Sequence, residues 1–298
     1  MSKSKGRSLK SEYDLKVSDF NTKRRPTWCS GCGNYSIWNS LKKAFVGLCL
    51  SPHEILMVYG IGCSGNGANF IKTYSFHSLH GRALPVATGA KLANHKMNVM
   101  AVGGDGDGVG IGGNHLIHTC RRNINITYIL HDNKVYGLTT GQAAPTSDKG
   151  FRSKSTPSGT IEIPINPVAL ALVSGATFVA RGFSGNTGQL RDIIKKGLKH
   201  KGFSFIDVLQ PCVTFNKQNT YDFYREHTYS LEDTRGYDSQ DLGLAIKKSM
   251  EEEKIPTGIF YQEERPVYED GLKQIERKPL VDHIISDTDI NKLLNKYF

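Results

Sequence analysis

Two turn-forming segments constrain the fold of this chain more than any other feature. Residues 104–108 (GDGDG) and 132–138 (DNKVYGL) each follow a short apolar stretch, at 98–102 and 126–130. Such stretches predict buried strands, and residues 110–122 between them have the length of a helix. Strand, helix and strand over about 30 residues predict a βαβ unit whose two strands are parallel. The chain is therefore expected to contain a doubly wound α/β sheet.

Two polar residues come directly after these strands. Asp105 and Asn133 each lie just past the carboxyl end of a predicted strand, and ligands of open α/β sheets bind at that edge. A carboxylate, an amide oxygen and a backbone carbonyl beside a helix N-terminus suit Mg²⁺ holding a diphosphate. Each segment alone is also typical of an ordinary turn. Their placement one βα unit apart favours the metal and diphosphate interpretation.

The whole sequence divides into three predicted regions. Residues 1–25 are expected to form a basic leader, 26–225 the α/β domain, and 226–298 a C-terminal extension that packs on the domain or on a partner chain. Residues 149–165, rich in Ser, Pro and Gly, are expected to form a surface loop. Apolar patterning predicts further strands at 55–59, 177–181 and 203–209, and further helices at 35–45, 167–173, 188–200 and 239–253.

Composition narrows the class of function. No stretch approaches the ~18 apolar residues that span a membrane. Residues 1–25 lack the apolar core of a secretory signal, so a cytoplasmic location is expected. The net charge is +10, but the Lys and Arg residues are dispersed along the sequence, which predicts no nucleic-acid partner. Phosphates, coenzymes or an acidic electron carrier account for the charge equally well.

Four of the six cysteines are placed to share one site. Cys29 and Cys32 form a C-x-x-C before a predicted helix, while Cys63 and Cys212 follow predicted strands and should emerge at the same sheet edge. Four converging thiolates hold either a [4Fe–4S] cluster or a structural zinc ion. Structural zinc sites usually contain two closely spaced C-x-x-C pairs, whereas this sequence has one pair and two remote cysteines. The spacing therefore favours an iron–sulfur cluster, and a zinc ion is the alternative. The two cysteines expected to be buried structural thiols are Cys49 and Cys120.

Several ordered motifs resemble those of one family. They are WCSGCG (28–33), GIGCSG (60–65), HSLHGRALPVATGAKLAN (77–94), GGDGDGVGIGGNH (103–115), HDNKVYGLTTGQAAPT (131–146) and QPC (210–212), with PTGIFY (256–261) as a weaker match. Together they make the chain similar to the beta subunit of the 2-oxoacid:ferredoxin oxidoreductases, archaeal and bacterial enzymes that oxidise pyruvate or 2-oxoglutarate. The resemblance implies an α/β fold of the type that binds thiamine diphosphate.

The resemblance also implies two cofactor sites. Thiamine diphosphate would be held through Mg²⁺ by Asp105, Asn133 and the carbonyl of Val135. One [4Fe–4S] cluster would be held by Cys29, Cys32, Cys63 and Cys212. The residues expected along the coenzyme are Ile61, Gly62, Cys63, Ser64, His80, Thr88, Gly106, Asp107, Gly137 and Leu138. His80 is also a candidate catalytic residue. The alternative is a purely structural role, in which His77 and His80 are hydrogen-bonded histidines of the core.

The activity implied by the resemblance is oxidative decarboxylation of a 2-oxo acid to acyl-CoA and CO₂. Coenzyme A, ferredoxin and an alpha subunit are the expected partners, and the chain would be active only with the alpha subunit. Some relatives carry Lys where this chain has Asn66 and Thr140, positions linked to the substrate carboxylate and to coenzyme A. The preferred 2-oxo acid and the Glu that activates the coenzyme are therefore left unassigned. The alternatives are a non-redox thiamine diphosphate-dependent decarboxylase or ligase subunit, and a zinc-stabilised binding module.

Overall fold

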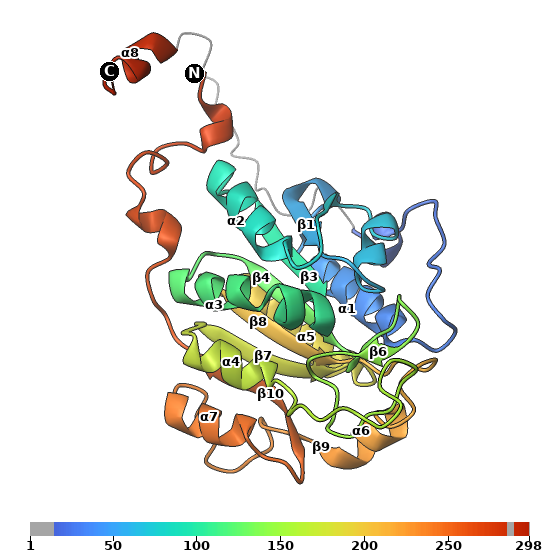
Figure 1. Cartoon of the computed structure of the whole chain (residues 1–298). Coiled ribbons are helices and arrows are strands. Elements are labelled where there is room, and N and C mark those ends of the chain that lie inside the picture. The colour runs from blue at the N-terminus through green and yellow to red at the C-terminus, as the bar shows by residue number, and fades with distance from the viewer. Residues whose placement is uncertain (1–14, 285–288, 298) are drawn as a thin grey trace, which may run out of the picture.

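The computed structural model describes residues 15–284 and 289–297. Its centre is an eight-stranded sheet with the strand order β2-β1-β3-β4-β8-β7-β10-β9 (Figure 1). The strands are β1 (Ile55–Tyr59), β2 (Tyr74–His77), β3 (Asn98–Gly104), β4 (Thr127–Asp132), β7 (Phe178–Phe183), β8 (Ser204–Leu209), β9 (Thr228–Ser230) and β10 (Ile255–Gln262). A separate antiparallel pair consists of β5 (Val135–Tyr136) and β6 (Gln142–Ala143).

Neighbouring strands of the large sheet are parallel except at the pair formed by β7 and β10. The predicted doubly wound, mostly parallel fold is thereby confirmed. β10 lies in the segment expected to be an extension and was not among the predicted strands; Pro256 and Gly258 interrupt its apolar pattern. Its register against β7 shifts between Ile259 and Tyr261. Part of the C-terminal extension therefore completes the sheet.

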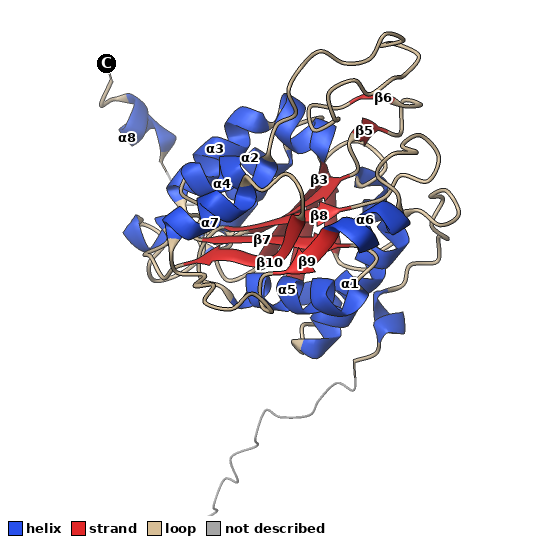
Figure 2. Ribbon diagram, turned by 90° about the horizontal axis from the view of Figure 1, so that it is seen from below, coloured by secondary structure: helices blue, strands red, loops and turns tan. Residues whose placement is uncertain are grey.

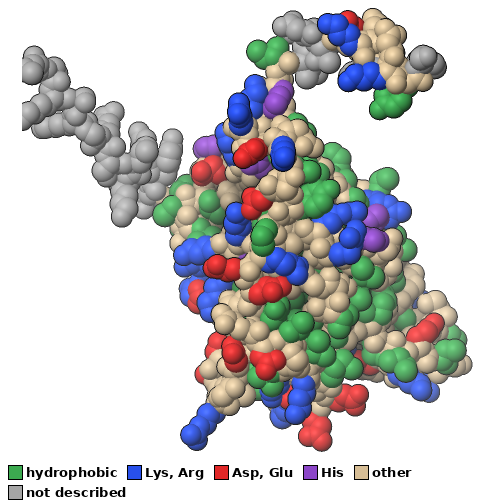
Figure 3. All heavy atoms as spheres, turned by 90° about the vertical axis from the view of Figure 1, so that its left-hand side faces the viewer, with side chains coloured by type: hydrophobic (Ala, Val, Ile, Leu, Met, Phe, Trp, Pro, Cys, Tyr) green, Lys and Arg blue, Asp and Glu red, His purple; other side chains and the backbone are tan. Residues whose placement is uncertain are grey.

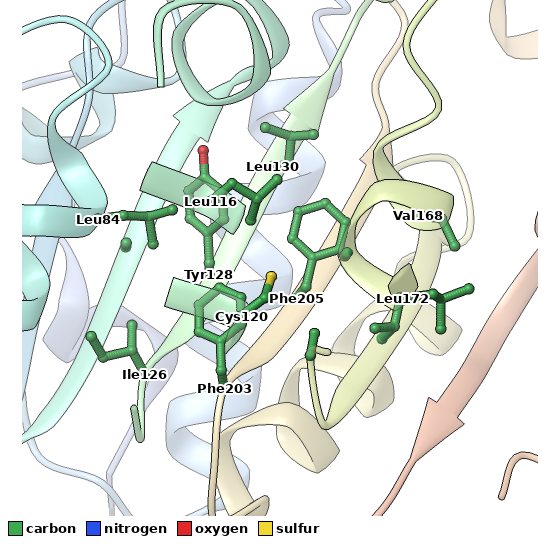
Figure 4. Close-up of a cluster of buried hydrophobic side chains, with 14 of the residues drawn as sticks. Leu84, Leu116, Cys120, Ile126, Tyr128, Leu130, Val168, Leu172, Phe203 and Phe205 are labelled. Carbon is green, nitrogen blue, oxygen red and sulfur yellow. The ribbon is translucent and has the colours of Figure 1, made fainter. Parts of the chain in front are cut away.

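Helices cover both faces of the sheet (Figure 2). One face carries α2 (Ala83–Ala93), α3 (Gly113–Arg122), α4 (Pro167–Val173) and α7 (Leu242–Ser249), and the other carries α1 (Gly33–Gly47) and α5 (Thr187–Lys199). On the α3 side, Leu116 and Cys120 lie in one buried cluster with Tyr128 and Phe205 (Figure 4). Ile129, next to Tyr128 on β4, belongs to the cluster on the opposite face. Both faces are apolar, as a covered parallel sheet requires.

Helix α5 shows how the sequence produces this packing. Leu190, Ile193, Ile194 and Gly197 are its buried residues, at the three- and four-residue spacings of one helix face. A Cβ at Gly197 would lie 2.9 Å from Ile206 Cδ1, so glycine lets the helix approach β8 closely. The N-terminus of α5 is closed by the side chain of the preceding Asn, which accepts a hydrogen bond from a first-turn amide.

The structure tests the predicted burial of Cys49 and Cys120 and describes part of the predicted leader. Cys120 is buried as expected, but the prediction for Cys49 is wrong: it is exposed. Cys49 has a φ of +55° in the turn that ends α1, and this left-handed turn directs its side chain to solvent. Residues 1–14 of the leader lie outside the described residues, whereas Phe20 is fully buried with its ring centroid 5.4 Å from that of Phe45.

Loops and edges complete the chain. Residues 149–165 contain no helix or strand, as predicted.

Strand β2 forms one edge of the sheet with all of its side chains exposed, among them Tyr74 (58 %) and Phe76 (52 %). Helix α8 (Ile290–Leu294) projects from the body, and Figure 3 shows charged and apolar side chains interspersed below it. Within residues 15–284 and 289–297, no helix is long and apolar enough to cross a membrane.

Candidate active site

The two predicted metal ligands lie side by side at the carboxyl edge of the sheet. β3 and β4 are parallel neighbours, with Gly104 opposite His131. Asp105 and Asn133 follow the last residues of these strands, and both are buried. The chain leaves β3 through a π-helical turn (Gly106–Ile111) that leads into α3. The βα spacing in the sequence thus places both polar groups where ligands of such sheets bind.

The carboxylate of Asp105 is fixed by two hydrogen bonds. Its Oδ1 accepts from the Gly106 amide at 2.9 Å, and its Oδ2 accepts from Thr146 Oγ1 at 2.5 Å. Burial raises the pKa of Asp105 to about 6, against the lowering effect of these hydrogen bonds. Each oxygen retains acceptor capacity, because a carboxylate has about four lone-pair sites. Sequence reasoning missed Thr146, whose partner lies far back in the chain.

Asn133 presents an amide oxygen beside this carboxylate. Its Oδ1 accepts from the Val135 amide at 3.0 Å, while its Nδ2 donates to Gln210 Oε1 at 3.2 Å. Between Asn133 and Val135 the chain turns at Lys134, which has a φ of +58°. One carboxylate, one amide oxygen and the adjacent backbone form a set of hard oxygen donors. Such donors fit Mg²⁺.

A cavity of about 70 Å³ opens at this edge. The predicted site residues that line it are Ile61, Gly62, Cys63, Ser64, His80, Asp105, Gly106, Asp107, Asn133, Val135, Gly137 and Leu138. Thr88 does not line it, because it lies within helix α2. Gly104, Tyr136 and Thr139 also line it and were not predicted. We refer to this space as the coenzyme cavity.

Glycines shape the walls of the coenzyme cavity. Gly62 has a φ of +128°, and a Cβ there would meet nothing within 4 Å. The backbone at this point therefore faces open space. At Gly106 a Cβ would lie 2.1 Å from Tyr136 Cε1, so the tyrosine ring packs directly on the turn. The Tyr136 hydroxyl also donates to the Gly106 carbonyl at 3.1 Å.

Asp107 ties together two loops around the cavity. Its Oδ1 accepts from the amides of Ile61 at 2.9 Å and Gly81 at 2.8 Å. Burial raises the pKa of Asp107, and the two amide hydrogen bonds lower it. His80 Nδ1 lies 3.5 Å from the same oxygen, and the His80 side chain is 38 % exposed. His77 is exposed, so the alternative that made both histidines core residues is not supported.

The four predicted cysteines line a second cavity, of about 190 Å³. These are Cys29, Cys32, Cys63 and Cys212. A Cβ at Gly137 would lie 3.5 Å from the Sγ atom of Cys63 and 3.7 Å from that of Cys212. Burial raises the pKa of Cys32 to about 12 and that of Cys63 to about 11. A cationic group in the cavity would offset this effect and favour the thiolates. We refer to this space as the cysteine cavity.

Within the described residues, the cysteine cavity presents four thiols without a preformed site for one metal ion. In the described ranges, no three His, Cys, Asp or Glu side chains are close enough to bind a single metal ion. Four thiols around a cavity of about 190 Å³ instead match the Cys₄ ligand set of an iron–sulfur cluster. Trp28 Nε1 donates to the Cys63 carbonyl at 2.7 Å, and Gln210 Nε2 donates to Cys32 Sγ at 3.3 Å. Both contacts hold the cysteine segments in place.

The two cavities share a wall. Cys63, Asn133, Gly137 and Leu138 line both of them. Neither lining contains a Lys, an Arg or a Glu from the described part of the chain. Groups bound in the two spaces would therefore be immediate neighbours.

The residues that replace lysines of some relatives also lie here. Asn66 and Thr140 both line the cysteine cavity. Thr140 has a φ of +78°, which is strained for a β-branched residue.

Two family models match the chain. Residues 60–208 match the thiamine pyrophosphate enzyme C-terminal TPP binding domain, and residues 212–277 match the C-terminal region of the pyruvate ferredoxin oxidoreductase beta subunit. Thiamine pyrophosphate is thiamine diphosphate, so the first match supports the predicted coenzyme. It spans the strands that carry Asp105 and Asn133.

Individual relatives agree with these matches. The 2-oxoacid:ferredoxin oxidoreductase subunit beta of Saccharolobus solfataricus is 46 % identical, over 80 % of this chain and 82 % of the relative. Subunit beta of 2-oxoacid:ferredoxin oxidoreductase 2 from Aeropyrum pernix is 44 % identical, over 86 % of this chain and 87 % of the relative. A solved 2-oxoglutarate:ferredoxin oxidoreductase from Magnetococcus marinus, with 2-oxoglutarate, coenzyme A and succinyl-CoA bound, superposes with a TM-score of 0.88. It is 37 % identical, over 97 % of this chain and 98 % of that one. The chain therefore belongs to the beta subunits of the 2-oxoacid:ferredoxin oxidoreductases.

Proposed function

We propose that the chain is the beta subunit of an enzyme that oxidatively decarboxylates a 2-oxo acid with coenzyme A. The products are acyl-CoA and CO₂, and the electrons pass through one [4Fe–4S] cluster to ferredoxin. The observation that carries this proposal is the wall shared by the coenzyme cavity and the cysteine cavity at Gly137. A non-redox decarboxylase or ligase has no need of four cysteines beside its coenzyme.

In this proposal the sheet edge holds and orients the coenzyme. Asp105, Asn133 and the Val135 carbonyl are the Mg²⁺ ligands, and Thr146 keeps the Asp105 carboxylate in position. When bound, thiamine diphosphate supplies the electron sink that decarboxylation of a 2-oxo acid requires. The exposed backbone at Gly62 leaves room for it. The Asp107 carboxylate keeps the neighbouring loops closed around that space.

The cysteines have the second role. Cys29, Cys32, Cys63 and Cys212 are the proposed ligands of the cluster. The Trp28 and Gln210 contacts orient two of them before any group is bound. Because Cys63 lines both cavities, electrons leaving the substrate have a short path.

In this proposal the site is completed by the alpha subunit. No Glu of the described residues lines either cavity, and in this proposal the alpha subunit supplies the acid that activates the coenzyme. Lys134 Nζ pairs with Asp148 Oδ1 at 2.5 Å and is not available for an anion. The solved relative binds 2-oxoglutarate, coenzyme A and succinyl-CoA. With Asn66 and Thr140 in this chain, the cation for the substrate or for coenzyme A would be Arg82 of this chain or a residue of the partner.

The test uses the chain co-expressed with its alpha subunit and purified without oxygen. We expect bound iron with acid-labile sulfide, bound thiamine diphosphate, and ferredoxin reduction that depends on both a 2-oxo acid and coenzyme A. The isolated chain should be inactive. Full activity of the isolated chain would refute the shared site. Coenzyme without iron would indicate the non-redox alternative, and zinc without coenzyme would indicate the binding module.

A further inference from the structure

The segment of the chain that contains Cys29, Cys32 and Cys63 is strongly basic in sequence. Between Asp19 and Asp105 there are nine Lys or Arg residues, and Glu54 is the single acidic residue. This segment accounts for most of the net charge of +10. Three of the four proposed cluster ligands lie in it. A surface of one sign around a redox group attracts a partner of the opposite sign.

Two arginines of this segment lie next to the cysteine cavity. Arg24 and Arg25 are exposed and line a cavity of about 370 Å³. Thr27 and Asn66 line both this cavity and the cysteine cavity, so the two spaces adjoin. Among the residues that the structure describes, neither guanidinium has an acidic partner within ion-pair distance. We refer to Arg24 and Arg25 as the arginine rim.

The backbone that carries the arginine rim is held on both sides. Before the rim, Thr22 Oγ1 donates to the Asn69 carbonyl at 2.8 Å. After it, the Tyr35 hydroxyl lies 3.3 Å from the Pro26 carbonyl and 3.2 Å from that of Trp28. The Trp28 ring also packs edge-on against Tyr35, with centroids 5.3 Å apart. A partner that binds the rim therefore orders little additional backbone.

The rim also lies beside the thiol closest to solvent. Cys29 is the exposed member of the four cysteines, whereas Cys32 and Cys212 are buried. Only Pro26, Thr27 and Trp28 separate Arg25 from Cys29 in the sequence. An electron carrier bound at the arginine rim would approach the cysteine cavity from its open side.

We propose that the arginine rim is the docking site of an acidic one-electron carrier protein. This inference rests on the proposed function, in which ferredoxin is the oxidant. Oxidation of one 2-oxo acid releases two electrons, so two carrier molecules dock in turn and each is reduced by one electron. Exposed rim charges act mainly on the rate of association, and salt screens them. Loss of the rim should therefore slow capture of the carrier and leave the chemistry unchanged.

The experiment compares charge reversals in the complete enzyme with its alpha subunit. R24E/R25E tests the rim. R121E/R122E is the matched control, because these exposed arginines end α3 and change the net charge equally. The next residue, Asn123, accepts from the amide of Phe203 at the start of β8, which places the control at the opposite sheet edge. An acidic ferredoxin and a viologen dye serve as electron acceptors over a range of ionic strength.

For R24E/R25E we expect kcat/KM for ferredoxin to fall about tenfold or more at low ionic strength. The difference should shrink as salt is added. Bound iron, the viologen rate and the KM for coenzyme A should match those of the wild type. R24Q/R25Q should give a smaller loss in the same direction, and R121E/R122E should keep most of the ferredoxin activity.

Several results would overturn the docking proposal. They are an unchanged kcat/KM for ferredoxin, an equal loss in the control, or loss of the alpha subunit from R24E/R25E and R24Q/R25Q. A rise in the KM for coenzyme A alone would assign the rim to that anion instead. A wild-type complex that contains no iron, or that reduces neither acceptor, would refute the proposed function and the docking proposal with it.

Discussion

The substitution Gly60→Ala tests the link between Asp107 and the two loops of the coenzyme cavity. A Cβ at residue 60 would lie 1.9 Å from Asp107 Oδ2 and 2.4 Å from Cγ. Asp107 is only 3 % exposed, so its carboxylate cannot move away freely. Displacing it breaks the hydrogen bonds from the Ile61 and Gly81 amides. At about 1.5–3 kcal/mol for each bond to a charged group, we expect a loss of about 3–6 kcal/mol.

A double-mutant cycle isolates this contact. Asp107→Ala removes both the obstacle and the hydrogen bonds, so adding Gly60→Ala to that variant should cost less than about 1 kcal/mol. The free energy of unfolding is measured in urea by circular dichroism for the wild type, both single variants and the double variant. Gly113→Ala is the control, because a Cβ there meets nothing within 4 Å. Additive losses in the cycle would refute the reasoning.

Three further predictions follow from the site. Thr146→Val removes the hydrogen bond to Asp105 and should weaken Mg²⁺-dependent thiamine diphosphate binding about tenfold in calorimetry, whereas Thr146→Ser should not. Cys29→Ser should lower bound iron measured by chemical analysis, and Cys49→Ser, which lies outside the cysteine cavity, should retain it. Burial lowers the pKa of His131 to about 3, so the unfolded chain gains a proton first as the pH falls below 6.5. The free energy of unfolding should then fall by about 1.4 kcal/mol per pH unit between pH 6.5 and pH 3. Urea unfolding of His131→Asn should show a smaller decrease over the same pH range.

The central part of the fold and site is predictable because its signals are local. Apolar runs followed by glycine or polar turns mark β3 and β4, and parallel pairing then brings Asp105 and Asn133 together. Cys63 and Cys212 follow their strands in the same way. Local patterning and βα topology are sufficient for these features.

The features that escaped prediction depend on contacts distant in sequence or on turn geometry. β10 contains Pro256 and Gly258, and it becomes a strand through antiparallel pairing with β7. Thr146 matters only because it reaches Asp105 across 41 positions. Cys49 lies between two leucines, but the left-handed turn at this residue makes it exposed.

The exposed edge strand β2 has a consequence for how this chain behaves during synthesis. An unpaired strand edge with protruding aromatic side chains is a template for aggregation. In β2, Tyr74 and Phe76 are both more than half exposed. A chain that pairs through this edge with a second copy would become a substrate for chaperones and proteases. The concentration at which this chain is synthesised therefore affects its yield of folded protein.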